Sequence, residues 1–450
     1  MTETTARRPK RVDLIVVGGG AAGLLAAISA ARTWHEQAAP PRSGSLNILI
    51  LEKNDKIGRK ILATGNGRCN LTNALAVPAA YHGDDPRFCR GALHRYDVKA
   101  TLDFFLDLGL VCREEEDGRI YPVCQQAAAV VDLLAHEIER LHITAQTQQT
   151  VVSLEPVEPV FLGSQPLEKA PHWRLGLADG QKLDTTCVIL ATGGMASPNL
   201  GSDGSGYRLA QPLGHHLVEP LPALVQLTTA GRKTVSLSGI RVECGLSLLL
   251  GNQEISREAG EVLFTDYGLS GIPILQLSRT VSVSLQENSV EPLRIQLDLL
   301  PEWTESAIEA SIAHRISLNP ALHLSDLLTG LVHRKIGGFI VREALHTNLD
   351  QPVRTLSSRQ VKSLARSIKQ LELTVTGTKD FSQAQVTAGG LDCRDFLPDC
   401  LESRLKPGLF AAGELLDIDG DCGGYNLQWA WSSGLLAGAS AARLLTRVRA

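Results

Sequence analysis

Three glycines, Gly18, Gly20 and Gly23, have the spacing of a turn that holds the pyrophosphate of a dinucleotide. An apolar run at 12–17 precedes the turn and predicts a buried strand, and the Ala- and Leu-rich stretch 21–32 predicts a helix after it. Glycine permits the tight turn and lets backbone N–H groups approach a diphosphate at a helix N-terminus. We therefore expect a dinucleotide here. A packed turn without a ligand is the alternative.

A carboxylate follows the second predicted strand of the same unit. Residues 47–51 are predicted to form this buried strand, and Glu52 at its end could accept hydrogen bonds from a ribose diol. Glu52 lies 29 residues after Gly23, whereas about 20 is usual. We interpret the surplus, residues 33–45, as a surface loop because it contains two adjacent prolines and a glycine.

The segment 58–73 combines basic, amide and glycine residues directly after that carboxylate. Its Arg and Lys side chains could offset diphosphate charge, and Gly65 and Gly67 could expose backbone donors. We expect this segment to follow the cofactor. A solvated basic surface loop is the alternative.

Two further strand ends and one helix start are rich in glycine. The apolar strand 188–190 runs into Ala-Thr-Gly-Gly at 191–194, and 409–414 repeats the pattern near the C-terminus. A Gly-rich stretch, 417–428, opens the predicted last helix, 426–445. If the N-terminus of this helix points at the edge of a cofactor ring, its partial positive charge would stabilise negative charge on that ring. The aspartates of this stretch lack the spacing of a calcium loop.

Composition excludes several classes of protein. The 450 residues are 44% hydrophobic, carry a net charge of −4 and include only 4% aromatic residues. Disorder is excluded, and binding of nucleic acid mainly through nonspecific charge is disfavoured. A local basic face remains open, with Arg232, Lys233, Arg241 and the stretch 315–342 as its candidates.

Nine cysteines without C-x-x-C spacing favour reduced thiols, with neither a disulfide framework nor a metal site. The histidines lack metal-ligand spacing, so we expect no metal. We expect no signal peptide and no membrane span, because charged residues and glycines interrupt every apolar run. These patterns favour a cytoplasmic protein whose oligomeric state stays open.

The order of the predicted elements indicates an α/β, Rossmann-like domain that is interrupted by an insert. We assign 1–211 to its first part, 212–383 to a β-rich insert and 384–450 to its second part. Within the insert, 242–250, 281–285 and 293–297 are predicted strands, and about 301–346 is a predicted helical subdomain.

Together these segments resemble three-domain FAD flavoproteins, the aminoacetone-oxidase or bile-acid-inducible-N-like family of NAD(P)/FAD-dependent oxidoreductases. The resemblance covers nearly the whole chain. Its most specific parts are 58–60 with 64–70, 260–265 with 268–271, 386–390, and 423–428. It implies an FAD domain of the two-dinucleotide-fold type, interrupted by a β-barrel-like insert with a small helical part.

The residues expected to bind FAD lie in the first turn, the segment after the second strand, the two later strand ends and the start of the last helix. They are Gly18, Gly20, Ala22, Gly23, Glu52, Lys53, Arg59, Lys60, Thr64, Gly65, Asn66, Gly67, Arg68, Cys69, Asn70, Thr192, Gly193, Gly413, Glu414, Gly424, Asn426, Leu427 and Gln428. No second strand-bound glycine motif is present, so either NAD(P)H binds transiently or the electrons are exchanged with another partner.

Three residues are candidates for proton transfer. Cys69 stands beside Arg68, which could lower the pKa of the thiol and make it the acid that protonates a substrate carbon. A buried packing residue is the alternative. Cys422 and Tyr267 are weaker candidates, since a packing thiol and a turn explain them as well.

Three functions are compatible with these patterns. The first is an FAD enzyme that moves a hydride between flavin N5 and a small conjugated molecule. The second is reduction of uridine to dihydrouridine in ribosomal RNA, because the uracil C5=C6 bond belongs to a conjugated enone. The third is a non-catalytic FAD-binding scaffold.

Overall fold

The computed structural model describes residues 11–37, 45–157, 161–162, 165–166, 172–231, 233–287 and 291–449. The chain forms two compact units. The first unit comprises residues 1–221 and 386–450, and the insert unit comprises residues 222–385. Each unit has its own hydrophobic core.

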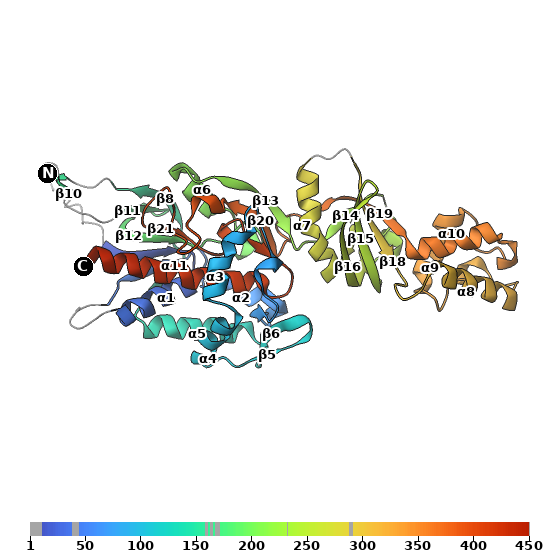
Figure 1. The fold of residues 1–450 in the computed structure, drawn as a ribbon, viewed down its shortest axis with the longest axis horizontal. Coiled ribbons are helices and arrows are strands. Elements are labelled where there is room, and N and C mark those ends of the chain that lie inside the picture. The colour runs from blue at the N-terminus through green and yellow to red at the C-terminus, as the bar shows by residue number, and fades with distance from the viewer. Residues whose placement is uncertain are drawn as a thin grey trace. The chain divides into compact units, whose positions relative to one another are not determined.

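A central sheet organises the first unit (Figure 1). Its parallel strands are β1 (Arg11–Val17), β2 (Ile48–Leu51), β7 (Thr144–Gln146), β12 (Lys182–Leu190) and β21 (Leu409–Ala411). Two antiparallel strands, β11 (Trp173–Leu177) and β8 (Val151–Pro156), extend it beyond β12. The side chains of β2 and most of those of β1 and β12 are buried, as expected for a sheet covered on both faces.

Two long helices lie side by side in this unit: α1 (Ala21–Gln37) and α11 (Tyr425–Arg449) (Figure 1). A Cβ added at Gly438 would lie only 2.0 Å from the carbonyl oxygen of Ala26, so glycine is what permits the close approach. The predicted loop from residue 33 is wrong in its first part, because α1 continues to Gln37 with Trp34 buried. Residues 38–44 of that loop lie outside the described residues.

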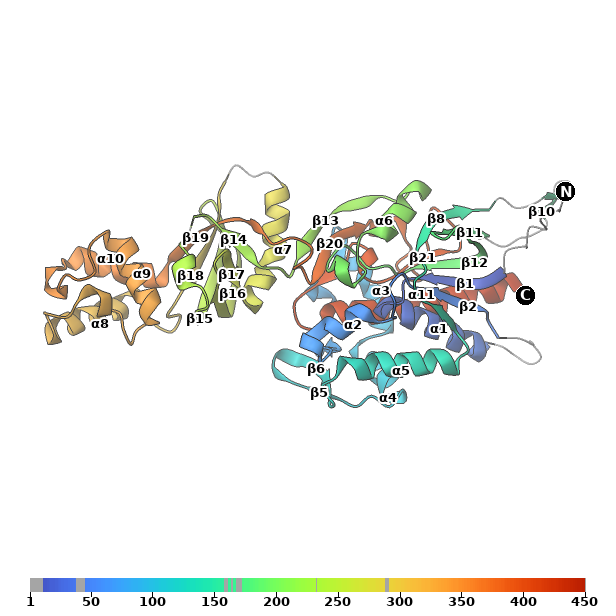
Figure 2. The same ribbon diagram turned by 180° about the vertical axis from the view of Figure 1, so that it is seen from behind.

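The remaining elements of the first unit surround this core (Figure 2). The helices are α2 (Arg59–Ala63), α3 (Arg90–Arg95), α4 (Val98–Asp107), α5 (Ala127–Arg140) and α6 (Ser205–Ala210). The small sheets are β3 (Thr72–Asn73) with β6 (Arg119–Pro122) and β5 (Cys112–Glu114), β4 (Tyr81–His82) with β22 (Asp419–Gly420), and β9 (Phe161–Leu162) with β10 (Gln165–Pro166). Strand β13 (Leu217–Ala223) pairs with β20 (Val386–Leu391).

The insert unit contains a closed barrel, as the resemblance implies. Its strands are β14 (Leu227–Thr229), β17 (Gly268–Ser270), β16 (Gln253–Phe264), β15 (Arg241–Leu250), β18 (Leu293–Asp298) and β19 (Leu371–Thr378), in that order around the barrel. The predicted α/β fold with a barrel insert is therefore confirmed.

Helices accompany the barrel, and two predictions about them need correction. The strand predicted at 281–285 belongs to helix α7 (Ile272–Gln286), because its Val-Ser alternation imitates a strand while Val281, Ser282 and Ser284 are all buried. The helical part contains α8 (Glu305–Leu318) and α9 (Arg334–Leu345), and extends past residue 346 to α10 (Ser358–Lys369).

Across the described ranges, none of the helices combines the length and the apolar character that a bilayer crossing requires.

Candidate cofactor site

Parallel pairing brings three strand ends to one edge of the central sheet. The Gly18 N–H donates to the Leu51 carbonyl at 2.8 Å, and the Ala412 N–H donates to the Leu190 carbonyl at 2.9 Å. The predicted residues Gly18, Thr192–Gly193 and Gly413–Glu414 follow these strands and therefore lie at the same edge. Gly413 reaches α1 itself, since a Cβ added to it would lie 2.9 Å from the Cβ of Ala22.

The glycine turn after β1 has the geometry of a diphosphate cradle. A Cβ at Gly23 would lie 1.9 Å from the Gly18 carbonyl oxygen, so no larger residue fits. Gly18 has a φ of +108°. Apart from Gly20 and its two chain neighbours, no heavy atom of the described residues lies within 4 Å of a Cβ added at Gly20. This open position at the start of α1 leaves room for a phosphate to approach the backbone.

Glu52 is fixed at the end of β2 by two backbone groups. Its Oε2 accepts the Gly19 N–H at 2.7 Å and its Oε1 accepts the Asn54 N–H at 2.8 Å. The residue is only 7% exposed. Each carboxylate oxygen keeps acceptor capacity beyond these bonds, so a ribose diol could donate to it.

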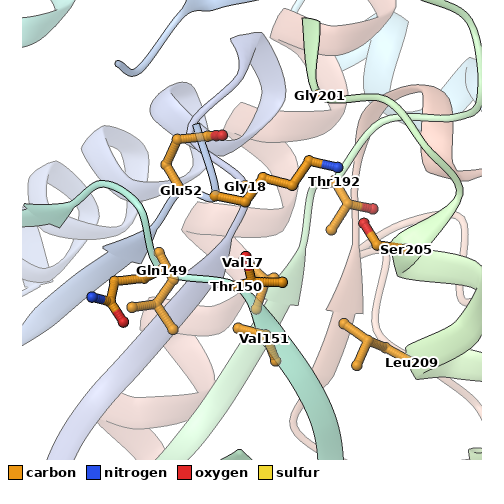
Figure 3. A pocket seen from close by; sticks show the side chains of 12 residues that line it. Val17, Gly18, Glu52, Gln149, Thr150, Val151, Thr192, Gly201, Ser205 and Leu209 are labelled. Carbon is orange, nitrogen blue, oxygen red and sulfur yellow. The ribbon is translucent and has the colours of Figure 1, made fainter. Parts of the chain in front are cut away.

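A pocket opens beside Glu52 (Figure 3). Its lining comes from the ends of β1 and β2 and the residues after them, from the start of β8 and the segment before it, from the residues after β12, and from α6 and the segment before it: Val17, Gly18, Leu51, Glu52, Lys53, Gln149, Thr150, Val151, Thr192, Gly201, Ser205 and Leu209. Residues 149–151 and 201–209 were not predicted as part of the site. The glycines Gly201, Gly204 and Gly206 were a signal for the second of these segments.

The segment 58–73 begins against the glycine turn, where the Gly58 N–H donates to the Gly19 carbonyl at 2.8 Å. Lys60 pairs with Glu414 at 2.8 Å. Arg59 is instead exposed beside Asp55, at 3.6 Å. The structure thus brings one predicted basic residue of this segment, Lys60, to the sheet edge.

The surroundings of Arg68 and Cys69 do not match the expectation that Arg68 activates the Cys69 thiol for proton transfer. The Arg68 guanidinium lies 4.0 Å from the centre of the Tyr121 ring and pairs with Glu115 at 2.5 Å. The Cys69 side chain is fully buried, and this burial raises the pKa of the thiol to about 12. The prediction that Arg68 lowers this pKa is therefore wrong, because Arg68 is engaged with Glu115 and desolvation dominates.

Asn70 carries an unsatisfied acceptor. Its side chain is buried, and its Oδ1 has no hydrogen-bond partner among the described residues. This oxygen lies beside Gly424, at 3.0 Å from a Cβ added there. A buried carbonyl oxygen without a donor is costly, so the position suits a ligand that carries an N–H group.

The start of α11 holds segment 58–73 in place. Thr72 Oγ1 donates to Gln428 Oε1 at 2.5 Å, and Asn73 Nδ2 donates to the Gly423 carbonyl at 2.9 Å. Asn426 Oδ1 accepts the Gly420 N–H at 2.9 Å. The side chains of Asn426 and Gln428 are thus engaged with protein groups, and it is the backbone N–H groups of the first turn that can face a ligand.

The other two proton-transfer candidates lie in different units. Cys422 precedes α11, and burial raises the pKa of its thiol although the charge of Arg119 opposes this rise. Tyr267 belongs to the insert unit, where the Lys379 ammonium lies 4.0 Å from the centre of its ring.

The donor and acceptor set fits FAD. The open Gly20 cradle suits a diphosphate, Glu52 suits a ribose, and the orphaned Asn70 oxygen suits the N–H of a flavin ring. In the part of the chain that the structure describes, no cluster of three His, Cys, Asp or Glu residues could hold a metal ion.

Known proteins resemble this chain along almost its full length. A family described as "HI0933-like protein Rossmann domain" matches residues 12–440. A 3-dehydro-bile acid delta(4,6)-reductase from Clostridium scindens is 40% identical over 427 residues, which cover 95% of this chain and 98% of the relative. A ribosomal RNA dihydrouridine synthase from Haemophilus influenzae is 30% identical over 433 residues, which cover 95% of this chain and 98% of the relative.

The chain also matches solved structures at lower similarity. The 3-ketosteroid delta1-dehydrogenase of Sterolibacterium denitrificans is 12% identical, with a TM-score of 0.48 over 96% of this chain and 99% of that chain.

Proposed function

This chain is an FAD-dependent oxidoreductase of the HI0933-like family, and from this premise we propose that it reduces a C=C bond conjugated with a carbonyl group in a small molecule. The observation that carries the proposal is a glycine turn with room for a diphosphate in a chain 40% identical to a bile-acid reductase. When bound, FAD supplies a hydride donor and acceptor at N5 of its flavin ring.

The chain's own residues bind and orient the cofactor in this proposal. The first turn of α1, with Gly20, holds the diphosphate, and Glu52 accepts from the ribose. Lys60 and Glu414 form a fixed pair at the sheet edge, since Glu414 also accepts the Thr387 N–H at 2.7 Å. The Asn70 oxygen and the backbone N–H groups of the first turn of α11 would hold the flavin ring and so set its orientation.

Reduction of a conjugated C=C bond requires one hydride and one proton. The hydride goes to the β-carbon, the proton goes to the carbon next to the carbonyl, and the two electrons come from a transient NAD(P)H. We assign the proton to water rather than to Cys69, because a fully buried thiol with a pKa of about 12 is a poor acid near neutral pH. Burial also raises the pKa of Cys422, which makes that thiol a weak candidate for the same reason.

The decisive experiment is an anaerobic half-reaction. Protein with FAD is reduced and then mixed with an enone steroid, with its saturated ketone as the matched control, while flavin absorbance is followed and product mass is measured. We expect the absorbance of oxidised flavin to return only with the enone, together with a gain of two hydrogens in the product. No reaction with any conjugated ketone would contradict the proposal.

A second candidate, reduction of uridine in RNA, is favoured by one surface. Helix α10 exposes Arg359, Lys362 and Arg366 on one face, and within the described residues Arg359 and Lys362 form no ion pair. The segment 311–370 has nine Lys and Arg against three Asp and Glu in a chain of net charge −4. Of the predicted basic residues, Lys233 pairs with Glu343 at 2.9 Å, and Arg232 lies outside the described residues.

RNA binding separates the two candidates. If RNA is the substrate, the charge reversals Arg359→Glu and Lys362→Glu should weaken binding of ribosomal RNA fragments and reduce its salt dependence. Dihydrouridine should also disappear from the ribosomal RNA of cells that lack the gene. If RNA is not the substrate, ribosomal RNA stays unchanged and only small enones are reduced.

A further inference from the structure

Two contacts connect the end of β2 with a segment about 150 residues later in the chain. Lys53 Nζ pairs with Asp203 Oδ1 at 2.7 Å. Asn54 Nδ2 donates to the Leu200 carbonyl at 3.2 Å. Both contacts involve the residues that immediately follow Glu52, and none of Asn54, Leu200 and Asp203 was predicted as part of the site.

The segment 200–205 is built to lie closely against residues 53–54. Gly201 has a φ of +110°, and a Cβ there would lie 2.4 Å from Asn54 Nδ2. The Gly204 N–H donates to the Gly194 carbonyl at 3.0 Å, which joins the segment to the strand end after β12. Asp203 Oδ1 also accepts the Ser205 N–H at 3.0 Å, so its carboxylate is oriented before it meets Lys53.

The same segment lines the pocket next to the ribose acid. Glu52 and Lys53 come from one side of this pocket, and Gly201, Ser205 and Leu209 come from the segment and from α6. Figure 3 shows Glu52 and Gln149 on one side and Ser205 and Leu209 on the other. The two contacts therefore connect opposite walls of the pocket expected to hold the adenosine half of FAD.

The charges of Lys53 and Asp203 stabilise the contact between the two sides of the pocket. Burial disfavours ionisation of Asp203, but the Lys53 ammonium and the hydrogen bonds from Ser205 outweigh it and lower the pKa of this carboxyl. The pair is ionised at neutral pH as a result. The Lys53 charge is already matched by the Asp203 carboxylate. We therefore expect Lys53 mainly to connect the two sides of the pocket rather than to neutralise a phosphate.

We propose that residues 200–205 form a clasp over the adenosine end of the cofactor site, held shut by Lys53–Asp203 and Asn54–Leu200, and that opening of this clasp limits the release of FAD. Asp203 and Asn54 are positioning residues in this scheme, since they act through the walls of the pocket. The inference rests on FAD binding and is independent of which conjugated substrate is reduced.

The test is the rate at which FAD leaves the intact protein, followed by the rise in free FAD fluorescence without any substrate. Asp203→Asn should speed release about two- to fivefold, the range for loss of a partly exposed ion pair, and the difference should shrink at high salt. The matched control is Asp103→Asn, which removes the exposed pair Lys99–Asp103 on α4 and should leave release unchanged. Lys53→Met should speed release by a similar factor, and the double variant Lys53→Met with Asp203→Asn should release FAD no faster than either single variant, because both changes remove the same pair.

A purely structural role for Asp203 predicts a different pattern. In that case Asp203→Asn would lower the unfolding temperature of the FAD-free protein, and the effects of Asp203→Asn and Lys53→Met on release would add in the double variant. Unchanged release in both Asp203→Asn and Lys53→Met would also overturn the proposal. If the protein releases FAD as expected but reduces no enone, the substrate assignment fails while the clasp stands.

Discussion

Single residues in this site act through backbone groups as much as through side chains. Glu52 is one example, since its two oxygens accept from Gly19 and Asn54 and so hold the carboxylate in place for a ribose. Cys69 is a contrasting example. Its neighbour Arg68 suggests an activated thiol, but its complete burial gives a protonated one.

We expect Glu52→Ala to weaken FAD binding by about 10- to 100-fold. The substitution removes charge-assisted hydrogen bonds to the ribose, which are worth about 1.5–3 kcal/mol in total. Titration of the FAD-free protein with FAD, followed by fluorescence, measures the change. Glu36→Ala, on the exposed face of α1, is the control and should bind FAD normally. Equal affinity in the two variants would contradict the assignment of Glu52.

Cys69→Ala should leave turnover per bound flavin within about threefold of the parent protein. A thiol with a pKa of about 12 stays protonated from pH 6 to 9, so the pH profile should keep its shape over this range. The substitution should instead lower the free energy of unfolding by about 1 kcal/mol, because a buried sulfur is lost. A general acid at this position would show a 10²- to 10⁴-fold loss of turnover, which would restore Cys69 as a catalytic residue.

At the scale of elements, one glutamine ties together segments that are far apart in the sequence. Gln428 on α11 is fully buried, and it accepts from Thr72 near β3 while its Nε2 donates to Thr101 on α4 at 2.8 Å and to the Tyr96 carbonyl. This network fixes the distance between segment 58–73 and the last helix, α11. The flavin end of the site therefore depends on a side chain that does not need to touch the flavin.

Gln428→Leu should destabilise the FAD-free protein by about 2–4 kcal/mol in urea unfolding. The change leaves the Thr72 and Thr101 hydroxyls and the Tyr96 carbonyl buried with fewer partners, and each such group is costly. FAD affinity should fall with it, because segment 58–73 loses its anchor. Gln286→Leu, at the exposed end of α7, should change neither quantity. Normal stability of Gln428→Leu would show that the network is dispensable.

The elements show which features a sequence reveals and which it does not. The strand before Gly18, the strand ending in Glu52 and the last helix were predictable because apolar runs and glycine turns are local patterns. Asp203 was not predictable, because its importance comes from a contact with Lys53 that only the folded chain creates. The end of α1 and the identity of α7 were misjudged because tertiary burial of Trp34 and of the Val-Ser segment overrides local turn and strand signals.

At the scale of the whole molecule, the chain consists of two units with separate cores. The core of the first unit includes β1, α1 and α11, and the core of the insert unit includes the barrel strands and the helices α8 to α10. All the residues that we assign to FAD belong to the first unit. Separate cores imply separate unfolding transitions, and a ligand stabilises only the unit that binds it.

Calorimetry of the intact protein should therefore show two transitions, of which FAD raises only one. At a free FAD concentration 100 times the dissociation constant, binding adds about 2.7 kcal/mol to the stability of the first unit, enough to raise its midpoint by several degrees. The insert transition should stay in place, and barrel variants such as Phe264→Ala should lower it alone. Glu52→Ala should reduce the FAD-dependent shift, and it should also lower the first-unit transition of the FAD-free protein, because the Gly19 and Asn54 N–H groups lose their acceptor. A single transition that FAD shifts as a whole would mean that the two units unfold together, and FAD binding would then stabilise the barrel as much as the site.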